Sequence, residues 1–397
     1  MRVLFLTCHL PWPAVSGGRR RELELLRRLP DVEIDLVAVS KTPEEDRRNA
    51  GRLAEHCRSV AVFPAEPSAR PGQPPHVERH QSDAARRHLR DLVCSGSVDL
   101  VHVEGFYLFD LLPRPCPVPT LLVEQNVEHQ LCHQRAELAR DPADRARLHH
   151  EAELTRIAEE AAWRDADACA ALTDEDAAAM AQALGRPVDA VVPDGLAVPS
   201  AATTPTLADE PTAVFVANFA YSPNVDAAWY LVEEIVPRVR RTVPDARWQL
   251  VGNAPPDDLR AAAESDGLEV TGRVPAVESY LDTAHVVTCP LRVGGGVKVK
   301  VLEALAHGKA TVTTSVGAQG LARVRDAFVV ADDPHSFAAA TACLLTEPAA
   351  RRPLEAAARG AVEHLPTWDE AAGELRAAYE RVLATQPVLP SRTRIPA

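Results

Sequence analysis

Short apolar runs alternate with helical patterns along almost the whole chain, and this alternation constrains the fold more than any other feature. In the first half, amphipathic stretches such as 16–29 lie between the apolar runs, and 137–169 is mostly helical in pattern. Alternation of this kind is typical of a parallel sheet with helices on both faces. The expected strands of the first half are 2–7, 32–40, 59–65, 98–105, 119–125, 168–173 and 189–195.

A second alternation begins after a change in composition. Residues 196–212 are rich in Pro, Ala and Thr without periodicity, so we expect a linker or a long surface loop there. Helices are expected over 222–243, with Ser222 as N-cap and Pro223 at the first helical position, and over 366–385. The expected strands of the second half are 213–219, 246–253, 268–274, 285–291, 310–316 and 327–332.

The two alternations predict an α/β fold with two Rossmann-like domains that face a cleft. A chain of 397 residues is longer than one typical core supports. Ligands of open parallel sheets bind beyond the carboxyl ends of the strands. We expect an N-terminal domain over 1–195, a linker over 196–212, a C-terminal domain over 213–365, and a final helix and tail over 366–397.

Composition argues against several classes of function. The net charge of −13 argues against nucleic-acid binding, which needs a basic face, and is consistent with a solubilising surface. No apolar run approaches the roughly eighteen residues of a membrane span, and the N-terminal apolar stretch is too short for a signal peptide. The eight cysteines form no CxxC or Cys/His cluster, so we expect no structural zinc and a reducing, cytoplasmic setting.

The segment PLRVGGGVKVKVLEALAHGKATVTT, residues 290–314, is the best candidate for a binding site. Gly294–Gly296 follow an expected strand, and a helix is expected to begin near Val297. Bare backbone and a helix N-terminus leave N–H groups free for an anion, and Lys298 and Lys300 add positive charge. We expect a diphosphate site, although GxxxxGK[ST] and GxGxxG are absent; the alternative is a flexible turn with solvated lysines.

Glu303 follows the two lysines in an otherwise apolar helical pattern. Burying a carboxylate is costly unless it is hydrogen-bonded, and a ribose diol would supply two hydrogen bonds. The alternative is an ion pair with Lys300 or His307 on the same helix. The N-terminal domain repeats the design, because a strand leads through a loop to Gly17 and Gly18 and then to a helix.

The order of several motifs resembles that of GT-B glycosyltransferases of family 4. The resemblance is to the bacterial sugar-transferase branch whose loop reads GGG-x-[RK]-x-K-x-LEA, and it extends from residue 1 to about 385. It implies that the helix over 366–385 packs back across the first domain. The motifs are PWPAVSGGRRRELELLRRL (11–29), EQNVEH (124–129), ALTDEDAAAM (171–180), VPDG (192–195), VANFAYSPNVDAAWYLVEEIVP (216–237) and PLRVGGGVKVKVLEALAHGKATVTTSVGAQGL (290–321).

The resemblance implies roles for individual residues. Glu303 matches the ribose-binding glutamate, and Gly295 stands where the wider family has a further glutamate that contacts the donor sugar. Gln125 stands where the family often has a histidine, and His129 is the alternative occupant of that place in the cleft. The other matches are Gly294, Gly295, Gly296, Lys298 and Lys300 for the diphosphate, Asn218, Gly272, Arg273 and Val274 for the rest of the donor, and Gly17 and Gly18 for the N-terminal loop.

These implications lead to an expected function. We expect a hexosyltransferase that moves a sugar from a nucleotide-sugar, most naturally a UDP-sugar, to a small-molecule, lipid or glycan acceptor. The resemblance implies a retaining reaction without metal or cofactor, and no DxD-type acid cluster follows an expected strand. The catalytic candidates are Lys298, Lys300 and Gln125. The alternatives are a GT-B-like sugar-nucleotide epimerase and a non-catalytic nucleotide-sugar-binding partner.

Overall fold

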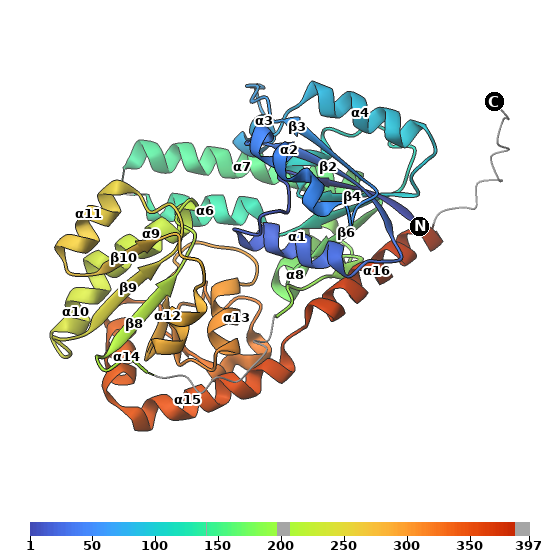
Figure 1. Cartoon of the computed structure of the whole chain (residues 1–397). Coiled ribbons are helices and arrows are strands. Elements are labelled where there is room, and N and C mark those ends of the chain that lie inside the picture. Colours follow the sequence, from blue (N-terminus) through green and yellow to red (C-terminus); the bar gives the residue numbers. More distant parts are fainter. Residues whose placement is uncertain (140, 197–206, 386–397) are drawn as a thin grey trace.

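Two parallel sheets, each with helices on both faces, make up the protein (Figure 1). The computed structural model describes residues 1–139, 141–196 and 207–385. All strand pairs within both sheets are parallel. The expected α/β fold class with two Rossmann-like domains is confirmed. Most of the expected linker, 197–206, lies outside the described residues.

The first sheet has seven strands in the order β3-β2-β1-β4-β5-β6-β7. Its strands are β1 (Arg2–Thr7), β2 (Glu33–Ser40), β3 (Ser59–Pro64), β4 (Leu100–Glu104), β5 (Thr120–Glu124), β6 (Ala168–Ala171) and β7 (Ala190–Val191). The helices of this half are α1 (Gly17–Arg27), α2 (Pro43–Asn49), η1 (Ala50–Leu53), α3 (Pro75–Arg79), α4 (Asp83–Cys94), α5 (Phe106–Phe109), α6 (Glu128–Leu138), α7 (Pro142–Asp165) and α8 (Asp174–Leu184).

The second sheet has six strands in the order β10-β9-β8-β11-β12-β13. Its strands are β8 (Thr212–Val216), β9 (Arg247–Val251), β10 (Glu269–Gly272), β11 (Val286–Cys289), β12 (Thr311–Thr313) and β13 (Val329–Val330). The helices of this half are α9 (Ser222–Tyr230), η2 (Leu231–Ile235), α10 (Val236–Arg240), α11 (Asp257–Ser265), α12 (Glu278–Thr283), α13 (Val299–Ala306), η3 (Ala322–Ala327), α14 (Pro334–Thr346), α15 (Pro348–Ala361), η4 (Val362–His364) and α16 (Trp368–Thr385).

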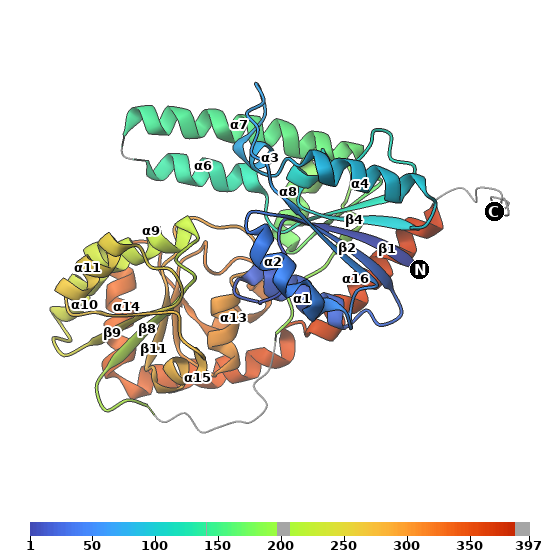
Figure 2. The ribbon, with the colours of Figure 1, turned by 45° about the horizontal axis from the view of Figure 1, so that its top comes forward.

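The helical segments differ from expectation in two places. The stretch over 137–169 is not one helix: α6 ends at Leu138, and Asp141 caps α7 by accepting hydrogen bonds from the next turn. α6 and α7 pack against each other and extend from the first sheet toward α9 (Figure 2). The helix expected over 222–243 contains the π-helical turn η2, and Tyr221 rather than Ser222 holds its cap position, without a side-chain bond.

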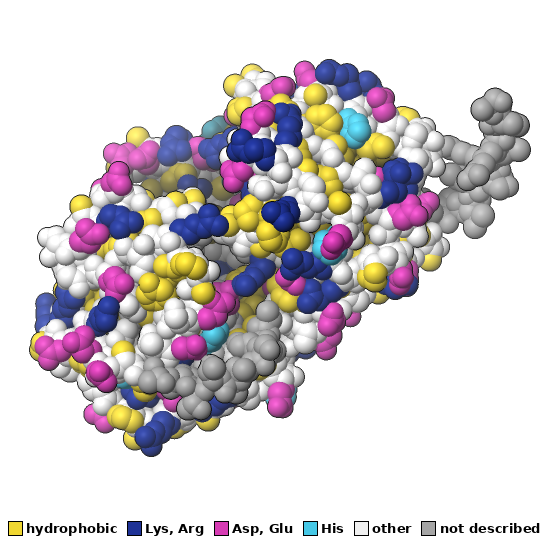
Figure 3. Space-filling model, in the orientation of Figure 1, with side chains coloured by type: hydrophobic (Ala, Val, Ile, Leu, Met, Phe, Trp, Pro, Cys, Tyr) yellow, Lys and Arg dark blue, Asp and Glu magenta, His cyan; other side chains and the backbone are white. Residues whose placement is uncertain are grey.

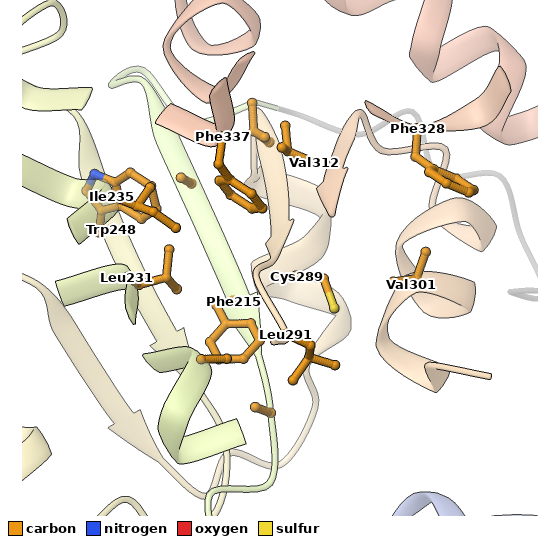
Figure 4. Packing of buried hydrophobic residues seen from close by; sticks show 14 of the residues in the cluster. Phe215, Leu231, Ile235, Trp248, Cys289, Leu291, Val301, Val312, Phe328 and Phe337 are labelled. Carbon is orange, nitrogen blue, oxygen red and sulfur yellow. The ribbon is translucent and has the colours of Figure 1, made fainter. Parts of the chain in front are cut away.

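Both faces of each sheet are covered by apolar side chains. In β1, Val3 and Phe5 face a core shared with α1 and α16, whereas Leu4 and Leu6 face a core shared with α4 and α7. This alternation explains why the strand reads as one continuous apolar run. The largest core of the second domain contains Phe215, Leu231, Ile235, Trp248, Cys289, Leu291, Val301, Val312, Phe328 and Phe337 (Figure 4).

The last helix returns to the first domain, as expected. α16 packs against α1, β5 and β7 of the first domain, with Trp368, Leu375 and Tyr379 buried in its core. The chain crosses between the domains twice, and the two crossings touch, because Leu196 N–H donates to Pro366 O at 2.8 Å. The return of α16 brings Tyr379 to the first sheet, where its Oη lies 2.8 Å from Nδ1 of His102 on β4.

Candidate functional site

Most of the expected site residues gather where the strand order of each sheet reverses, and Gly272, Arg273 and Val274 lie apart from them. In the first sheet β1 and β4 are neighbours, and in the second sheet β8 and β11 are neighbours. Ligands of open α/β sheets bind outside the carboxyl ends of strands at such points. Asn218 follows β8 and the glycine loop, Gly294–Gly296, follows β11. The loop from β1 to α1 ends at Gly17 and Gly18, across from α13.

The N-terminal ends of α1 and α13 meet between the two domains. A Cβ placed on Gly17 would lie 3.5 Å from Val299 Cγ2, so the first residues of both helices are in contact. α1 is capped by Ser16, whereas Lys298 holds the cap position of α13 without a side-chain bond. α13 therefore begins at Val299, two residues later than expected. Lys and Arg side chains gather over α1 in the space-filling view (Figure 3).

The glycine loop packs against the first domain. Gly294 N–H donates to Gln134 Oε1 of α6 at 2.9 Å. A Cβ on Gly295 would lie 2.8 Å from Leu131 Cδ1, and one on Gly296 would lie 2.8 Å from Gln125 O. Gly296 also has a φ of +60°, which favours glycine. In this arrangement the glycines permit close approach of the two domains, a role that the sequence did not indicate.

The two lysines of the loop have different surroundings. Lys298 Nζ donates to Gly295 O at 2.8 Å, Gly296 O at 2.6 Å and Gln319 Oε1 at 3.1 Å, which occupies all three of its N–H groups. Lys300 Nζ donates to Asn224 Oδ1 at 2.8 Å, and this is its single hydrogen bond among the described residues. Burial lowers the pKa of Lys298 to about 7 and also lowers the pKa of Lys300.

Glu303 is held by the other domain. Arg20 of α1 forms an ion pair and a hydrogen bond with Glu303 Oε1, and the Glu303 side chain is 24% exposed. Neither partner considered from the sequence is used: Lys300 bonds Asn224, and His307 Nδ1 lies 2.9 Å from Asp282 Oδ1. The carboxylate is therefore only partly exposed and already carries one charged partner, which belongs to the other domain.

The remaining donor-site candidates lie at two separate places on the second sheet. Asn218 stabilises the turn into α9, since its Oδ1 accepts from Ala220 N–H at 3.1 Å and its carbonyl accepts from Asn224 Nδ2 at 2.7 Å. Gly272, Arg273 and Val274 lie at the end of β10, two strands from β8 at the sheet edge. Among these, the Arg273 side chain is exposed and Gly272 has a φ of +68°.

Gln125 and His129 point to different partners. Gln125, just after β5, donates from Nε2 to Glu104 Oε2 at 3.0 Å, and a Cβ on Gly18 would lie 2.9 Å from its Oε1. His129 Nδ1 lies 2.6 Å from Glu159 Oε2 on α7, which also accepts from the His129 backbone N–H. Gln125 rather than His129 is therefore next to the N-terminal glycines.

A partly buried group of ionisable side chains after β1 escaped the sequence analysis. Cys8 Sγ lies 3.3 Å from His9 Nδ1, and His9 Nε2 lies 3.1 Å from Glu22 Oε1. Thr7 Oγ1 donates to both oxygens of Glu22, at 2.9 and 2.8 Å. The sequence feature that could have revealed this group is the pair Cys8-His9 directly after a strand, followed by Glu22 on the buried face of the next helix.

Burial and mutual charge shift the pKa values of this group. Burial raises the pKa of Glu22 to about 7. Burial alone would lower the pKa of His9, but Glu22 and Cys8 outweigh it and raise that pKa well above its ordinary value. Burial alone would raise the pKa of Cys8, but His9 and His80 hold it well below its ordinary value.

A match to a family model indicates the class of enzyme to which this arrangement belongs. Residues 210–347 match the family model described as glycosyl transferases group 1, a range that includes Asn218, the glycine loop and Glu303. The chain is a GT-B glycosyltransferase. No curated protein matches its sequence.

Solved structures similar to this glycosyltransferase share its fold at low identity. Anabaena Alr3699/HepE in complex with UDP-glucose is 14% identical, with a TM-score of 0.67, over 96% of this chain and 100% of that chain. An S. aureus TarM mutant in complex with fondaparinux, alpha-GlcNAc-glycerol and UDP is 8% identical, with a TM-score of 0.67, over 97% and 100%. A putative UDP-N-acetylglucosamine 2-epimerase from Listeria monocytogenes is 11% identical, with a TM-score of 0.57, over 98% and 97%.

Two further findings, on membrane-spanning helices and on groups of side chains that could bind a metal ion, concern only the residues that the structure describes. No helix in the described ranges is both long and apolar enough to cross a membrane. No three His, Cys, Asp or Glu side chains of the same ranges are grouped so that they could hold a metal ion.

Proposed function

We propose that this glycosyltransferase is a retaining, metal-independent enzyme of family 4 that takes a hexose-type sugar from a nucleotide-sugar. The observation that carries the proposal is the position of the glycine loop and Glu303, which lie in the group 1 glycosyltransferase domain and face α1 of the other domain. A UDP-sugar is the first candidate donor, because Anabaena HepE has been solved with UDP and with UDP-glucose. The acceptor is a small molecule, a lipid or a glycan, bound by the first domain.

The donor would lie along the start of α13. Its diphosphate would accept hydrogen bonds from the free backbone N–H groups there, where the helix dipole favours negative charge. Lys300 retains two N–H groups for a phosphate oxygen, whereas Lys298 holds the loop itself through its carbonyl oxygens. The ribose diol would replace Arg20 as the partner of Glu303.

The chemistry follows from where negative charge develops. As the bond between the anomeric carbon and the phosphate oxygen breaks, charge accumulates on the leaving diphosphate. Fixed N–H groups and the Lys300 ammonium stabilise that charge without reorganisation. The acceptor hydroxyl attacks the anomeric carbon on the same face and passes its proton to the leaving phosphate, so the reaction needs no protein nucleophile.

The test is a transfer assay with UDP-, GDP-, ADP- and dTDP-sugars over a panel of hydroxyl acceptors. We expect nucleoside diphosphate release above background with one donor, and a product whose anomeric configuration matches that of the donor by NMR. A product of inverted configuration would refute retention. Absence of both transfer and donor hydrolysis would favour a non-catalytic nucleotide-sugar-binding partner.

A sugar-nucleotide epimerase is the second candidate, and the ionisable group after β1 favours it. His9 and Glu22 supply an imidazole and a carboxyl, 3.1 Å apart, of the kind that proton abstraction requires. The fold is also similar to that of the putative Listeria epimerase. Interconversion of two UDP-sugars without an acceptor, with solvent deuterium entering the sugar, would support this candidate over the transferase.

The cellular location is part of the proposal. All eight cysteines are free thiols, and Cys57, Cys132, Cys169 and Cys289 are buried. Unpaired thiols persist in a reducing compartment, so we place the enzyme in the cytoplasm.

A further inference from the structure

We propose that Tyr379 on the C-terminal helix is a positioning residue, which acts through His102 and Glu104 to hold Gln125 with its side-chain oxygen facing the cleft. The inference rests on the proposed function, because it assigns Gln125 to the substrate cleft. It adds three residues that neither the motifs nor the resemblance indicated, and it gives the returning helix α16 a part in the site.

A continuous line of hydrogen bonds connects α16 with the cleft. Tyr379 Oη lies 2.8 Å from His102 Nδ1, and His102 Nε2 lies 2.8 Å from Glu104 Oε1. Glu104 Oε2 accepts from Gln125 Nε2 at 3.0 Å. The Tyr379 and His102 side chains are completely buried and Glu104 is 2% exposed. Water therefore cannot replace these partners, and each must satisfy the next.

Packing fixes the imidazole of His102 in the middle of this line. Phe5 of β1 stacks on one side, with ring centroids 4.1 Å apart and planes 15° apart. Tyr379 meets the ring edge-on, with centroids 5.7 Å apart. His102 thus cannot turn to exchange its two nitrogens without displacing buried aromatic rings.

The chemistry of each group sets the direction of the hydrogen bonds. Burial raises the pKa of Tyr379 well above its ordinary value, so its hydroxyl stays protonated and has a proton to donate to Nδ1. With Nδ1 as the acceptor, the His102 proton lies on Nε2 and is donated to Glu104. Burial alone would raise the pKa of Glu104, but its hydrogen bonds to His102 and Gln125 and the charge of Arg21 outweigh it and lower that pKa. Glu104 is therefore a carboxylate, which only accepts.

The carboxylate decides which end of the Gln125 amide faces the cleft. An acceptor-only partner takes the NH₂ group, so the carbonyl oxygen points the other way. That oxygen lies beside Gly18 at the start of α1, where a Cβ would come within 2.9 Å of it. The cleft at this point presents a neutral hydrogen-bond acceptor, which suits a hydroxyl of a sugar or acceptor rather than a phosphate or carboxylate.

The test compares Tyr379→Phe with the wild type, alone and combined with Gln125→Leu. Tyr379→Phe removes one hydroxyl and keeps the ring, so we expect a cooperative fold with a thermal midpoint lowered by only a few degrees, because one buried acceptor loses its partner. With Gln125 present, kcat should fall roughly tenfold or more, since small misplacement near the reacting atoms has effects of this size. UDP affinity should not change. In the Gln125→Leu background the same substitution should cause no further loss.

A control variant and a spectroscopic measurement separate positioning from simple stability. Val382→Ala removes a buried side chain from the same helix without touching the hydrogen-bond line, and its effect should be equal in both backgrounds. ¹⁵N-histidine NMR, with His102→Gln for assignment, should show protonated Nε2 in the wild type and a changed tautomer population in Tyr379→Phe.

The possible outcomes differ for the two proposals. A wild-type enzyme that transfers no sugar contradicts the proposed function. A wild type that transfers normally, with an equally active Tyr379→Phe variant, contradicts the positioning role alone. Additive effects of Tyr379→Phe and Gln125→Leu would also overturn it, because Tyr379 would then act on something other than Gln125.

Discussion

Arg20 on α1 and Glu303 on α13 form an ion pair that joins the two domains. The two residues are 283 positions apart in the sequence, and each belongs to a helix that begins at a glycine-containing loop. If Glu303 binds ribose, this ion pair competes with the nucleotide. This competition predicts that removing one side chain or the other has opposite effects on nucleotide affinity.

Removal of Glu303 should weaken nucleotide binding, and removal of Arg20 should strengthen it. Glu303→Ala loses charge-assisted hydrogen bonds to the ribose diol, at a cost of about 1.5–3 kcal/mol in UDP binding. Arg20→Ala frees Glu303, and because Arg20 is 38% exposed the gain should stay below about fivefold. Isothermal titration calorimetry with UDP measures both, and Glu24→Ala on α1 is the matched control. Unchanged UDP affinity in Glu303→Ala would remove Glu303 from the site.

Gly18→Val should slow transfer more than it weakens nucleotide binding. Its Cβ would come within 2.9 Å of Gln125 Oε1, which belongs to the first domain, whereas the donor contacts belong to the second domain. We expect kcat to fall roughly tenfold or more, with UDP affinity within about threefold of the wild type. Gly373→Val on α16, whose Cβ would meet nothing within 4 Å, is the control. If Gly18→Val abolished UDP binding while bound donor still turned over at the normal rate, the proposed division of roles between the two domains would be wrong.

A side chain at Gly295 should prevent the two domains from closing. A Cβ there would lie 2.8 Å from Leu131 Cδ1 and 3.0 Å from Asn126 Cβ, both in the first domain. Small-angle scattering should show that UDP compacts the wild type and leaves Gly295→Val extended, because ligands at an interdomain cleft draw domains together. Gly360→Val, at a site with nothing within 4 Å, should behave as the wild type. Identical wild-type profiles with and without UDP would count against closure.

The buried Glu22 should make stability depend on pH. Burial raises its pKa from 4.5 to about 7, so the folded state binds more protons than the unfolded state between those values. The contribution of Glu22 to stability therefore falls as pH rises from about 4.5 to 7, by about 1–3 kcal/mol. Glu22→Gln should flatten this part of the stability profile in urea unfolding, whereas Glu24→Gln on the same helix should not. A profile of the same slope in Glu22→Gln would contradict the assignment.

Transfer should persist in excess EDTA. The Lys300 ammonium and the N–H groups at the start of α13 would provide the positive charge that a divalent ion provides in other transferases. The measurement is the initial rate with and without chelator, followed by addition of Mg²⁺ or Mn²⁺. A rate abolished by EDTA and restored by either ion would show that the enzyme needs a metal.

The sequence by itself determined the two α/β units and the position of the glycine loop. Strand and helix periodicities are local properties, because each reports which faces of a short segment are buried. For the same reason, Gly294–Gly296 could be placed between a strand and a helix. Periodicity did not reveal where one helix ends and the next begins. The boundary between α6 and α7 at Asp141 therefore could not be predicted from it.

Only the tertiary structure decided which side chains meet. Glu303 is paired with Arg20 rather than with a neighbour on its own helix, and Lys298 bonds the carbonyl oxygens of its own loop. Tyr379 reaches His102 from 277 positions away because α16 returns to the first domain. Such contacts depend on how the two sheets and their helices pack, and packing brings together residues whose separation in the sequence carries no information about their distance in space.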